Sequence, residues 1–393
     1  HSLTDATTDM RLCNALVRDV EEAAVATDVS GPRLAELESR SAATVAVEEL
    51  CFVYNDELLG HIRRAVDYFD GQVAAHEMST LGFDSFGKEQ IKGLGVSPDA
   101  FVQMAMQLAY YRQFRQFPPT YESASTKAFA RGRTETSRSV SEHSAAWCRA
   151  MVDDPAATSL HDKAEILRRA ITQQSQVTAH CAKGSGIDRH LLGLEYALLP
   201  GEPVPAIFLD PVFIASRHWK LSTSQISDPI LDAYGWGEVV DDGFGIAYRI
   251  ENDALHFTVV SQRLGAGRLC QYLSDALMDM RFLLSNAHRQ PHEIMAEVDA
   301  VASALRSIRL QSSSPQRPRS PHAAQDRRSP DHGPAPAGTD TSQAWAPAHD
   351  TAGVCAVVGE LERLPSSDVI CALETRLSRF VKESLRWALP STS

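Results

Sequence analysis

The sequence has no excess of positive charge. Its 393 residues include 38 Lys and Arg against 50 Asp and Glu, which gives a formal net charge of −12. Proteins that bind nucleic acid or anionic membrane surfaces generally need clustered Lys and Arg on one face. We therefore expect no nucleic-acid partner, and any anion that this protein binds must be held by a local cluster of basic residues.

Long apolar runs and paired cysteines are also missing. No stretch approaches the roughly 18 apolar residues of a membrane span, so we predict no transmembrane segment. The seven cysteines are odd in number, scattered, and without any Cys-x-x-Cys pair. That pattern argues against a disulfide framework or a zinc site and indicates a reducing compartment. We expect no bound metal.

Apolar residues, at 44% of the chain, are enough to build a core, but they are unevenly distributed. Residues 311–349 are rich in Ser, Pro, Arg and Gly, so we predict a disordered linker there. Residues 350–390 form the predicted helical extension, with a helix over 367–388. Packing on the domain or on a partner protein is favoured over membrane binding, because Glu374 and Glu383 lie on its polar face.

Strands and helices alternate in the rest of the chain. This order predicts an α/β fold, a two-layer sandwich with a mixed sheet. The expected strands are 50–54, 78–83, 205–209, 244–250 and 255–260. The expected helices are 56–77, one that begins at Ser97-Pro98, 160–182, 186–198 and 266–285.

A pair of lysines stands out between the second expected strand and the next helix. Lys88 and Lys92 are four residues apart and lie between Gly87 and Gly93, so they face one side of a single turn. Such a cluster could bind a phosphate. The alternative is a solvated lysine pair with no ligand.

Three further segments are dense in polar side chains. Hydroxyls and arginines at 120–126 and 132–139 could line a site for a small polar ligand, or form a Ser/Thr-rich surface loop. The charged residues 188–190 precede an apolar helix, which Asp188 could simply cap. Small hydroxyls at 222–225 suit an oxyanion donor or a turn.

Taken in order, these motifs closely resemble the carnitine/choline acyltransferases over about residues 1–290. The resemblance implies their chloramphenicol-acetyltransferase-like fold. It rests on HSLTDA (1–6), the lysine pair, SPDAF (97–101), QLAYYR (107–112), TYESAS (120–125), GRTET (132–136), DRHLLGL (188–194), STSQ (222–225) and DGFG (242–245). The residues beyond about 300 have no counterpart in this resemblance.

The resemblance implies the catalytic roles. His1 matches the general base that takes the proton from the carnitine hydroxyl, a task that suits a pKa near neutrality. Asp5 matches the acidic residue of the same motif, which in the family pairs with the arginine matched by Arg133. Ser224 matches the hydroxyl that stabilises the tetrahedral oxyanion.

The resemblance also implies the binding residues, with coenzyme A or acetyl-CoA as co-substrate and no permanently bound cofactor. Lys88 and Lys92 match the lysines that hold the 3′-phosphate of coenzyme A, and Asp99 and Gln225 match further contacts with it. Arg189 matches the arginine that supplies the long-range counter-charge to the carnitine carboxylate, which favours carnitine over choline, because choline has no carboxylate. The residues expected to bind carnitine are Tyr121, Ser123, Thr134, Arg189 and Ser222.

Acyl-chain length depends on the volume of the pocket. Long-chain members have a glycine-rich stretch before the residue that matches Gly237, whereas here Tyr234 falls where a bulky side chain would close the channel. The Tyr-Gly-Trp string at 234–236 resembles fungal-type members that transfer acetyl groups. We therefore expect carnitine O-acetyltransferase activity with acetyl or another short acyl group.

By the same resemblance, residues 1–45 are the C-terminal edge of a first acyltransferase domain and 46–300 a second one. The chain starts with His, so we expect it to be processed or cut from a longer protein. We expect a monomer in the mitochondrial matrix or the peroxisome. The alternative is a truncated or inactive acyltransferase that only binds coenzyme A or a protein partner.

Overall fold

The computed structural model describes residues 6–27 and 50–303, apart from positions 154, 156, 227, 229, 291, 295, 297, 301 and 302. The chain divides into a unit His1–Ser285 and a unit Asn286–Ser393. His1, Asp5, the predicted linker and the predicted helix 367–388 lie outside the described residues. The first unit contains the sheet.

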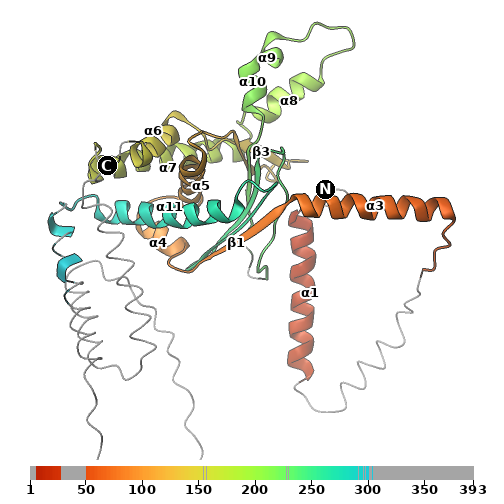
Figure 1. The fold of residues 1–393 in the computed structure, drawn as a ribbon, viewed down its shortest axis with the longest axis horizontal. Coiled ribbons are helices and arrows are strands. Elements are labelled where there is room, and N and C mark those ends of the chain that lie inside the picture. The colour runs from red at the N-terminus through yellow and green to blue at the C-terminus, as the bar shows by residue number, and fades with distance from the viewer. Residues whose placement is uncertain are drawn as a thin grey trace, which may run out of the picture. The chain divides into compact units, whose positions relative to one another are not determined.

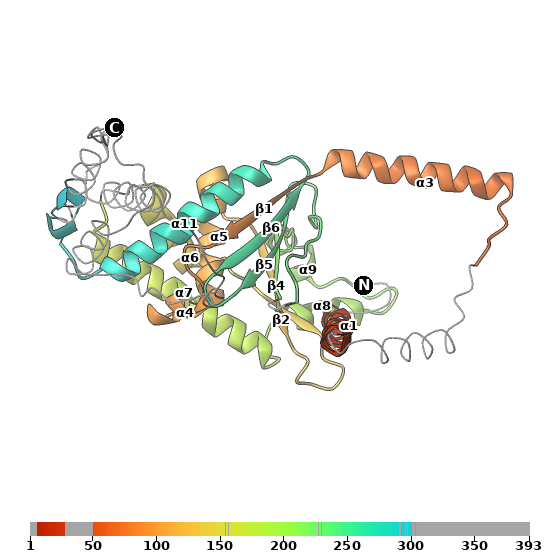
Figure 2. The same ribbon diagram turned by 90° about the horizontal axis from the view of Figure 1, so that it is seen from below.

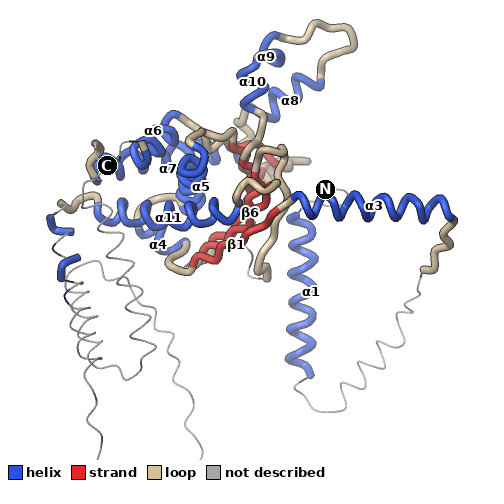
Figure 3. Tube along the Cα trace, viewed as in Figure 1, coloured by secondary structure: helices blue, strands red, loops and turns tan. Residues whose placement is uncertain are grey.

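The centre of this unit is a mixed sheet of six strands in the order β1-β6-β5-β4-β2-β3. The sheet lies between the helices in Figure 1, and Figure 3 draws its strands in red. β2–β4 and β4–β5 pair in parallel, and β1–β6, β5–β6 and β2–β3 pair antiparallel. β5 is buried along its whole length, as expected for a central strand with cover on both faces. The strands are β1 (Glu77–Phe83), β2 (Thr120–Ser125), β3 (Thr134–Ser137), β4 (Leu221–Gln225), β5 (Phe244–Ile250) and β6 (Leu255–Ser261).

Helices α5, α7 and α11 gather on one side of the sheet (Figures 1 and 2). Together with α4 and α6 they form the second layer. This confirms the predicted two-layer α/β sandwich with a mixed sheet. Their bounds are α4 (Lys88–Gly93), α5 (Pro98–Phe114), α6 (Glu142–Val152), α7 (Leu160–Ala182) and α11 (Ala266–Asn286).

The central helix is α5. It begins as the sequence predicts, because the Ser97 side chain accepts a hydrogen bond from the amide of Ala100 and Pro98 occupies the first turn. Every residue from Ala100 to Tyr111 is buried, so the helix is enclosed on all sides, and not along one face only. Polar groups that it carries must therefore find partners inside the protein.

The remaining helices lie outside this layer. They are α1 (Ala6–Thr27), α3 (Asp56–Ala75), α8 (Asp188–Tyr196), α9 (Ala206–Leu209) and α10 (Pro211–Ser216). α3 starts at an Asn55 cap, close to the predicted position, and has no buried residue. Among the described helices none is both long and apolar enough to cross a membrane.

Two predicted strands are wrong. Residues 50–54 have no regular structure and are exposed, with Val53 98% exposed, so this apolar run pairs with no strand of the sheet. In place of the predicted strand 205–209, residues Ala206–Leu209 form the short helix α9 after Pro205. Proline has no N–H to donate to a sheet, and its φ of −56° suits a helix start.

Candidate active site

Strands β2 and β4 carry hydroxyl side chains on the face of the sheet away from α5. Tyr121 pairs in register with Ser222, and the next residues on that face are Ser123 and Ser224. The Oγ atoms of Ser123 and Ser224 are 2.8 Å apart. Both serines are half-buried, so the two hydroxyls form a hydrogen-bonded pair that a ligand can still reach.

Arg189, in the first turn of α8, adds a positive charge beside these hydroxyls. Its Nη2 lies 3.4 Å from both the Tyr121 hydroxyl and the Thr134 hydroxyl, and its Nε donates to the carbonyl of Thr134. The backbone amide of Arg189 is held by the buried carboxylate of Glu135 at 3.2 Å. The exposed guanidinium is therefore anchored at its base and available to an anion at its tip.

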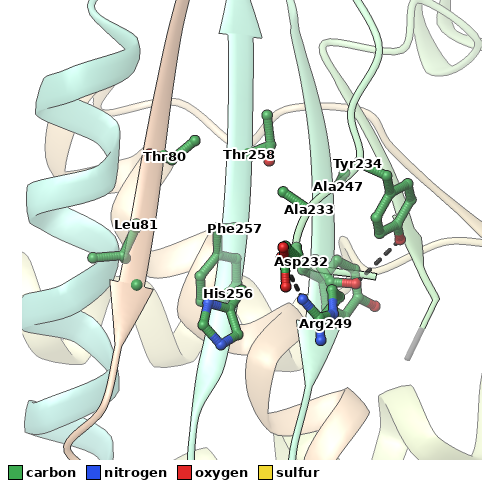
Figure 4. Close-up of a pocket in the computed structure, with 12 residues that line it drawn as sticks. Thr80, Leu81, Asp232, Ala233, Tyr234, Ala247, Arg249, His256, Phe257 and Thr258 are labelled. Atoms are coloured by element: carbon green, nitrogen blue, oxygen red, sulfur yellow. Dashed lines mark hydrogen bonds between the residues drawn. The ribbon is translucent and has the colours of Figure 1, made fainter. Parts of the chain in front are cut away.

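The segment 232–237 crosses the same face of β5. A Cβ at Gly245 would lie 2.4 Å from the carbonyl oxygen of Trp236, so only glycine allows this close approach. The crossing brings Tyr234 to the end of β4, where its hydroxyl donates to the carbonyl of Ser224 at 2.8 Å and to that of Tyr248 at 3.1 Å. Beyond Tyr234 lies a pocket of about 230 Å³ over β5, β6 and β1 (Figure 4).

Three of the four predicted coenzyme A residues lie on helices, and the fourth lies on β4. Lys88 and Lys92 are on α4, where the Lys92 ammonium pairs with Glu89 at 3.1 Å. The carboxylate of Asp99, in the first turn of α5, accepts a hydrogen bond from the Tyr248 hydroxyl at 2.7 Å. Gln225 is exposed and directly follows Ser224 on β4.

A second set of polar side chains lies on the opposite face of the same strands. Glu122 is 4% exposed, and its Oε2 accepts a hydrogen bond from Gln174. Burial and the nearby charge of Asp99 raise the pKa of Glu122 well above its ordinary value, so its charged form is disfavoured. The helix-side face thus holds a buried carboxyl on β2 between Tyr121 and Ser123, whose hydroxyls face the other side.

Comparison with known proteins shows the family of the chain. Residues 1–277 match the family model described as choline/carnitine O-acyltransferase. The chain belongs to the choline/carnitine O-acyltransferase family. The prediction of family membership from the ordered motifs is thereby confirmed.

Several curated family members are similar over much of this chain. The mitochondrial carnitine O-acetyltransferase of Saccharomyces cerevisiae is 35% identical over 63% of this chain and 38% of its own length. The human carnitine O-acetyltransferase is 37% identical over 62% and 39%. The mitochondrial carnitine O-palmitoyltransferase 2 of Bos taurus is 34% identical over 71% and 42%. Our chain thus spans about two fifths of the length of the curated acyltransferases that it matches.

Solved structures show a more distant likeness. A condensation domain of the enacyloxin polyketide synthase is 13% identical with a TM-score of 0.32, over 55% of this chain and 42% of that one. A wax ester synthase/diacylglycerol acyltransferase from Marinobacter aquaeolei is 12% identical with a TM-score of 0.30, over 59% and 58%. The α/β fold is assigned from the strand order of the sheet and the packing of the helices.

The structure brings part of the predicted acyltransferase site together. Six residues expected near carnitine or the oxyanion meet at β2, β3, β4 and the start of α8: Tyr121, Ser123, Thr134, Arg189, Ser222 and Ser224. Tyr234 joins them through the Ser224 carbonyl. The hydroxyl-rich segments at 120–125 and 134–137 are strands, so the alternative of a surface loop is wrong for them.

Other predicted residues of the family site are not joined to this cluster by the contacts described. Lys88 and Lys92 remain on α4, and Asp99 bonds to Tyr248 on the helix side. Arg133 is exposed, next to Thr134, while His1 and Asp5 lie outside the described residues. Their roles in the acyltransferase stay predictions.

Sequence reasoning missed the buried polar residues behind the site. Glu122 and Thr223 lie inside the motifs TYESAS and STSQ, and α5 supplies Gln103. The alternation of a strand could have separated Tyr121 and Ser123 from Glu122, since neighbouring residues face opposite sides. Gln103 gave a weaker signal, a single amide in an otherwise apolar helical run.

Proposed function

We propose that the protein transfers an acetyl or other short acyl group between coenzyme A and the hydroxyl of L-carnitine. The observation that carries this proposal is the cluster of Ser123, Ser224, Tyr121 and Arg189 on one face of β2 and β4. An anchored guanidinium suits a carboxylate, and a pair of hydroxyls suits a developing oxyanion. The assay that tests it is release of the free coenzyme A thiol from acetyl-CoA, measured with and without L-carnitine.

In this proposal His1 starts the reaction by taking the proton of the carnitine hydroxyl. The oxygen attacks the carbonyl carbon of the thioester and gives a tetrahedral oxyanion, which the hydroxyl of Ser224 stabilises. Collapse breaks the carbon–sulfur bond, and the leaving sulfur takes the proton back from His1. Ser123 is placed to donate to Ser224 at 2.8 Å, which leaves the Ser224 proton free for the oxyanion.

Asp5 and Arg133 would steady the histidine as an ion pair, by analogy with the matching residues of the family. Lys88 and Lys92 would hold the 3′-phosphate of coenzyme A, with Asp99 and Gln225 as further contacts. The lysines matter because the chain carries a net charge of −12, so the background field opposes a phosphate. Lys92 would exchange its present partner Glu89 for that phosphate.

We expect Arg189→Met to raise the KM for L-carnitine about 10- to 100-fold, the loss of one charge-assisted hydrogen bond to a carboxylate. The KM for acetyl-CoA should stay within about twofold. Steady-state kinetics in both substrates measures the difference. Arg217→Met is the matched control, because Arg217 pairs with Glu195 and not with the hydroxyl cluster. Equal rises in both KM values would contradict a role toward carnitine.

We expect Tyr234→Gly to extend the range of acyl groups, because Tyr234 lines the pocket over β5 and its hydroxyl donates to the Ser224 carbonyl. Relative kcat/KM for medium-chain over acetyl-CoA should rise by about tenfold or more, since a steric block is removed. Tyr234→Phe is the control: it loses the hydroxyl and keeps the bulk, so its chain-length profile should match the wild type. A Tyr234→Gly profile identical to the wild type would show that Tyr234 does not limit chain length.

One of the similar relatives is named a palmitoyltransferase, so the chain-length preference has to be tested directly. Identity to it, at 34%, is close to the 35–37% found for the two acetyltransferases named above, so similarity along the chain does not favour acetyl over palmitoyl. The bulk of Tyr234 is what supports a short acyl group. Two of those relatives are named mitochondrial, which supports the proposed mitochondrial location over a peroxisomal one.

A further inference from the structure

A buried amide on α5 connects the strands of the site from behind. Gln103 is 0% exposed and uses both ends of its amide. Its Nε2 donates to the Thr223 hydroxyl at 3.0 Å and to the Tyr248 hydroxyl at 2.9 Å. Its Oε1 accepts from Ser139 at 2.6 Å. One side chain thus bonds to β4, to β5 and to the segment after β3.

These bonds lie where the backbone pairing of β2 and β4 stops. The parallel ladder between the two strands ends at the pair Glu122–Thr223. The next residues are Ser123 and Ser224, whose hydroxyls are 2.8 Å apart on the other face. The Thr223 hydroxyl also donates to the carbonyl of Tyr121 at 2.9 Å, so a side chain reinforces the link between the two strands where the ladder ends.

Tyr248 extends the same network across β5. Its hydroxyl donates to the Asp99 carboxylate at 2.7 Å and lies 3.2 Å from Oε1 of Glu122. Glu122 also hydrogen-bonds to Asp99, and burial with the charge of Asp99 raises the pKa of Glu122. The amide of Gln103 and the hydroxyls of Thr223 and Tyr248 each donate to an acceptor within this network. A fully paired buried network is rigid, and loss of one member leaves others unpaired.

We propose that Gln103 and Tyr248 are positioning residues for acyl transfer: from the helix side they hold β2, β4 and β5 so that Ser123 and Ser224 keep their hydrogen bond. This inference rests on the proposed function. The hydrogen bonds of both side chains lie on the helix side, although Tyr248 also lines the pocket next to Tyr234. Gln103 acts through Thr223, which directly precedes Ser224 on β4. Tyr248 acts through Glu122, which directly precedes Ser123 on β2.

The test compares Gln103→Leu with Gln107→Leu in the protein expressed from its complete coding sequence. Gln107 lies one turn further along α5, is 1% exposed, and donates to Thr120 at the start of β2. Gln103→Leu should lower kcat about tenfold or more while both KM values stay within about threefold. Gln107→Leu should leave kcat within about twofold of the wild type, even if its Tm falls as far as that of Gln103→Leu.

Tyr248→Phe provides a second variant if Gln103→Leu does not fold. It removes one oxygen and keeps the ring that stacks on Phe257, and kcat should fall in the same way. A folded Gln103→Leu or Tyr248→Phe protein with unchanged kcat and a lowered Tm would overturn the proposal, because the network would then serve stability alone.

Crystal structures of the wild type and Gln103→Leu separate this inference from the proposed function. We expect the distance between the Oγ atoms of Ser123 and Ser224 to exceed hydrogen-bond reach in the variant. An unchanged distance overturns the positioning role, whether or not the wild type transfers acyl groups to carnitine. A wild type without carnitine-dependent transfer overturns the proposed function.

Discussion

Ser224→Ala should lower kcat for acetyl transfer by about 100- to 1,000-fold, the usual loss when one oxyanion donor is removed. The donor acts only in the transition state, where the carbonyl oxygen becomes charged, so KM for either substrate should change little. Ser224 is well placed for this, half-buried at the end of β4 with its backbone carbonyl fixed by Tyr234. Steady-state kinetics with acetyl-CoA and L-carnitine measures the effect.

Ser125→Ala is the matched control for that loss. Ser125 follows Ser123 on the same face of β2 but is exposed and pairs with Thr134 at the far end of the strand pair. Its removal should leave kcat within about twofold. If Ser224→Ala keeps more than about a third of the wild-type kcat, the oxyanion must be stabilised by another group.

His1→Ala should abolish carnitine-dependent release of thiol. Without a base, the carnitine hydroxyl keeps its proton and is a poor nucleophile toward a thioester at neutral pH. The expected loss is at least about 100-fold from general-base catalysis alone. The assay is the same thiol release, in the protein expressed from its complete coding sequence.

His190→Ala is the control for the histidine. His190 is exposed in α8, next to Arg189, and has no proposed part in proton transfer. It should retain the wild-type rate. A His1→Ala protein that is folded and as fast as the wild type would show that another group removes the proton, or that the reaction is different.

Helix boundaries followed closely from local sequence signals. Ser97 and Pro98 start α5, and the periodic runs at 160–182 and 266–285 became α7 and α11 with almost the predicted ends. Caps and periodicity act within a few residues, so a sequence reports them directly. The apolar run 50–54 carried an equally clear local signal and still failed, because a strand also needs a neighbour to pair with.

The sequence likewise predicted only part of the site. Residue types and order were enough to identify the family and to single out Tyr121, Arg189 and Ser224. They did not reveal that Ser123 and Ser224, 101 positions apart, share a hydrogen bond of 2.8 Å. That contact depends on the parallel register of β2 and β4, which the chain sets only after α6 and α7 have crossed between them.

The sequence by itself determined the family, the net negative charge and the chemistry available at each motif. Those properties belong to residue types and their order. Only the tertiary structure decided that the hydroxyls face one side of the sheet while Gln103, Glu122, Thr223 and Tyr248 meet on the other. The physical reason is that a strand sends neighbouring side chains to opposite faces, and the register of distant strands fixes which of them meet.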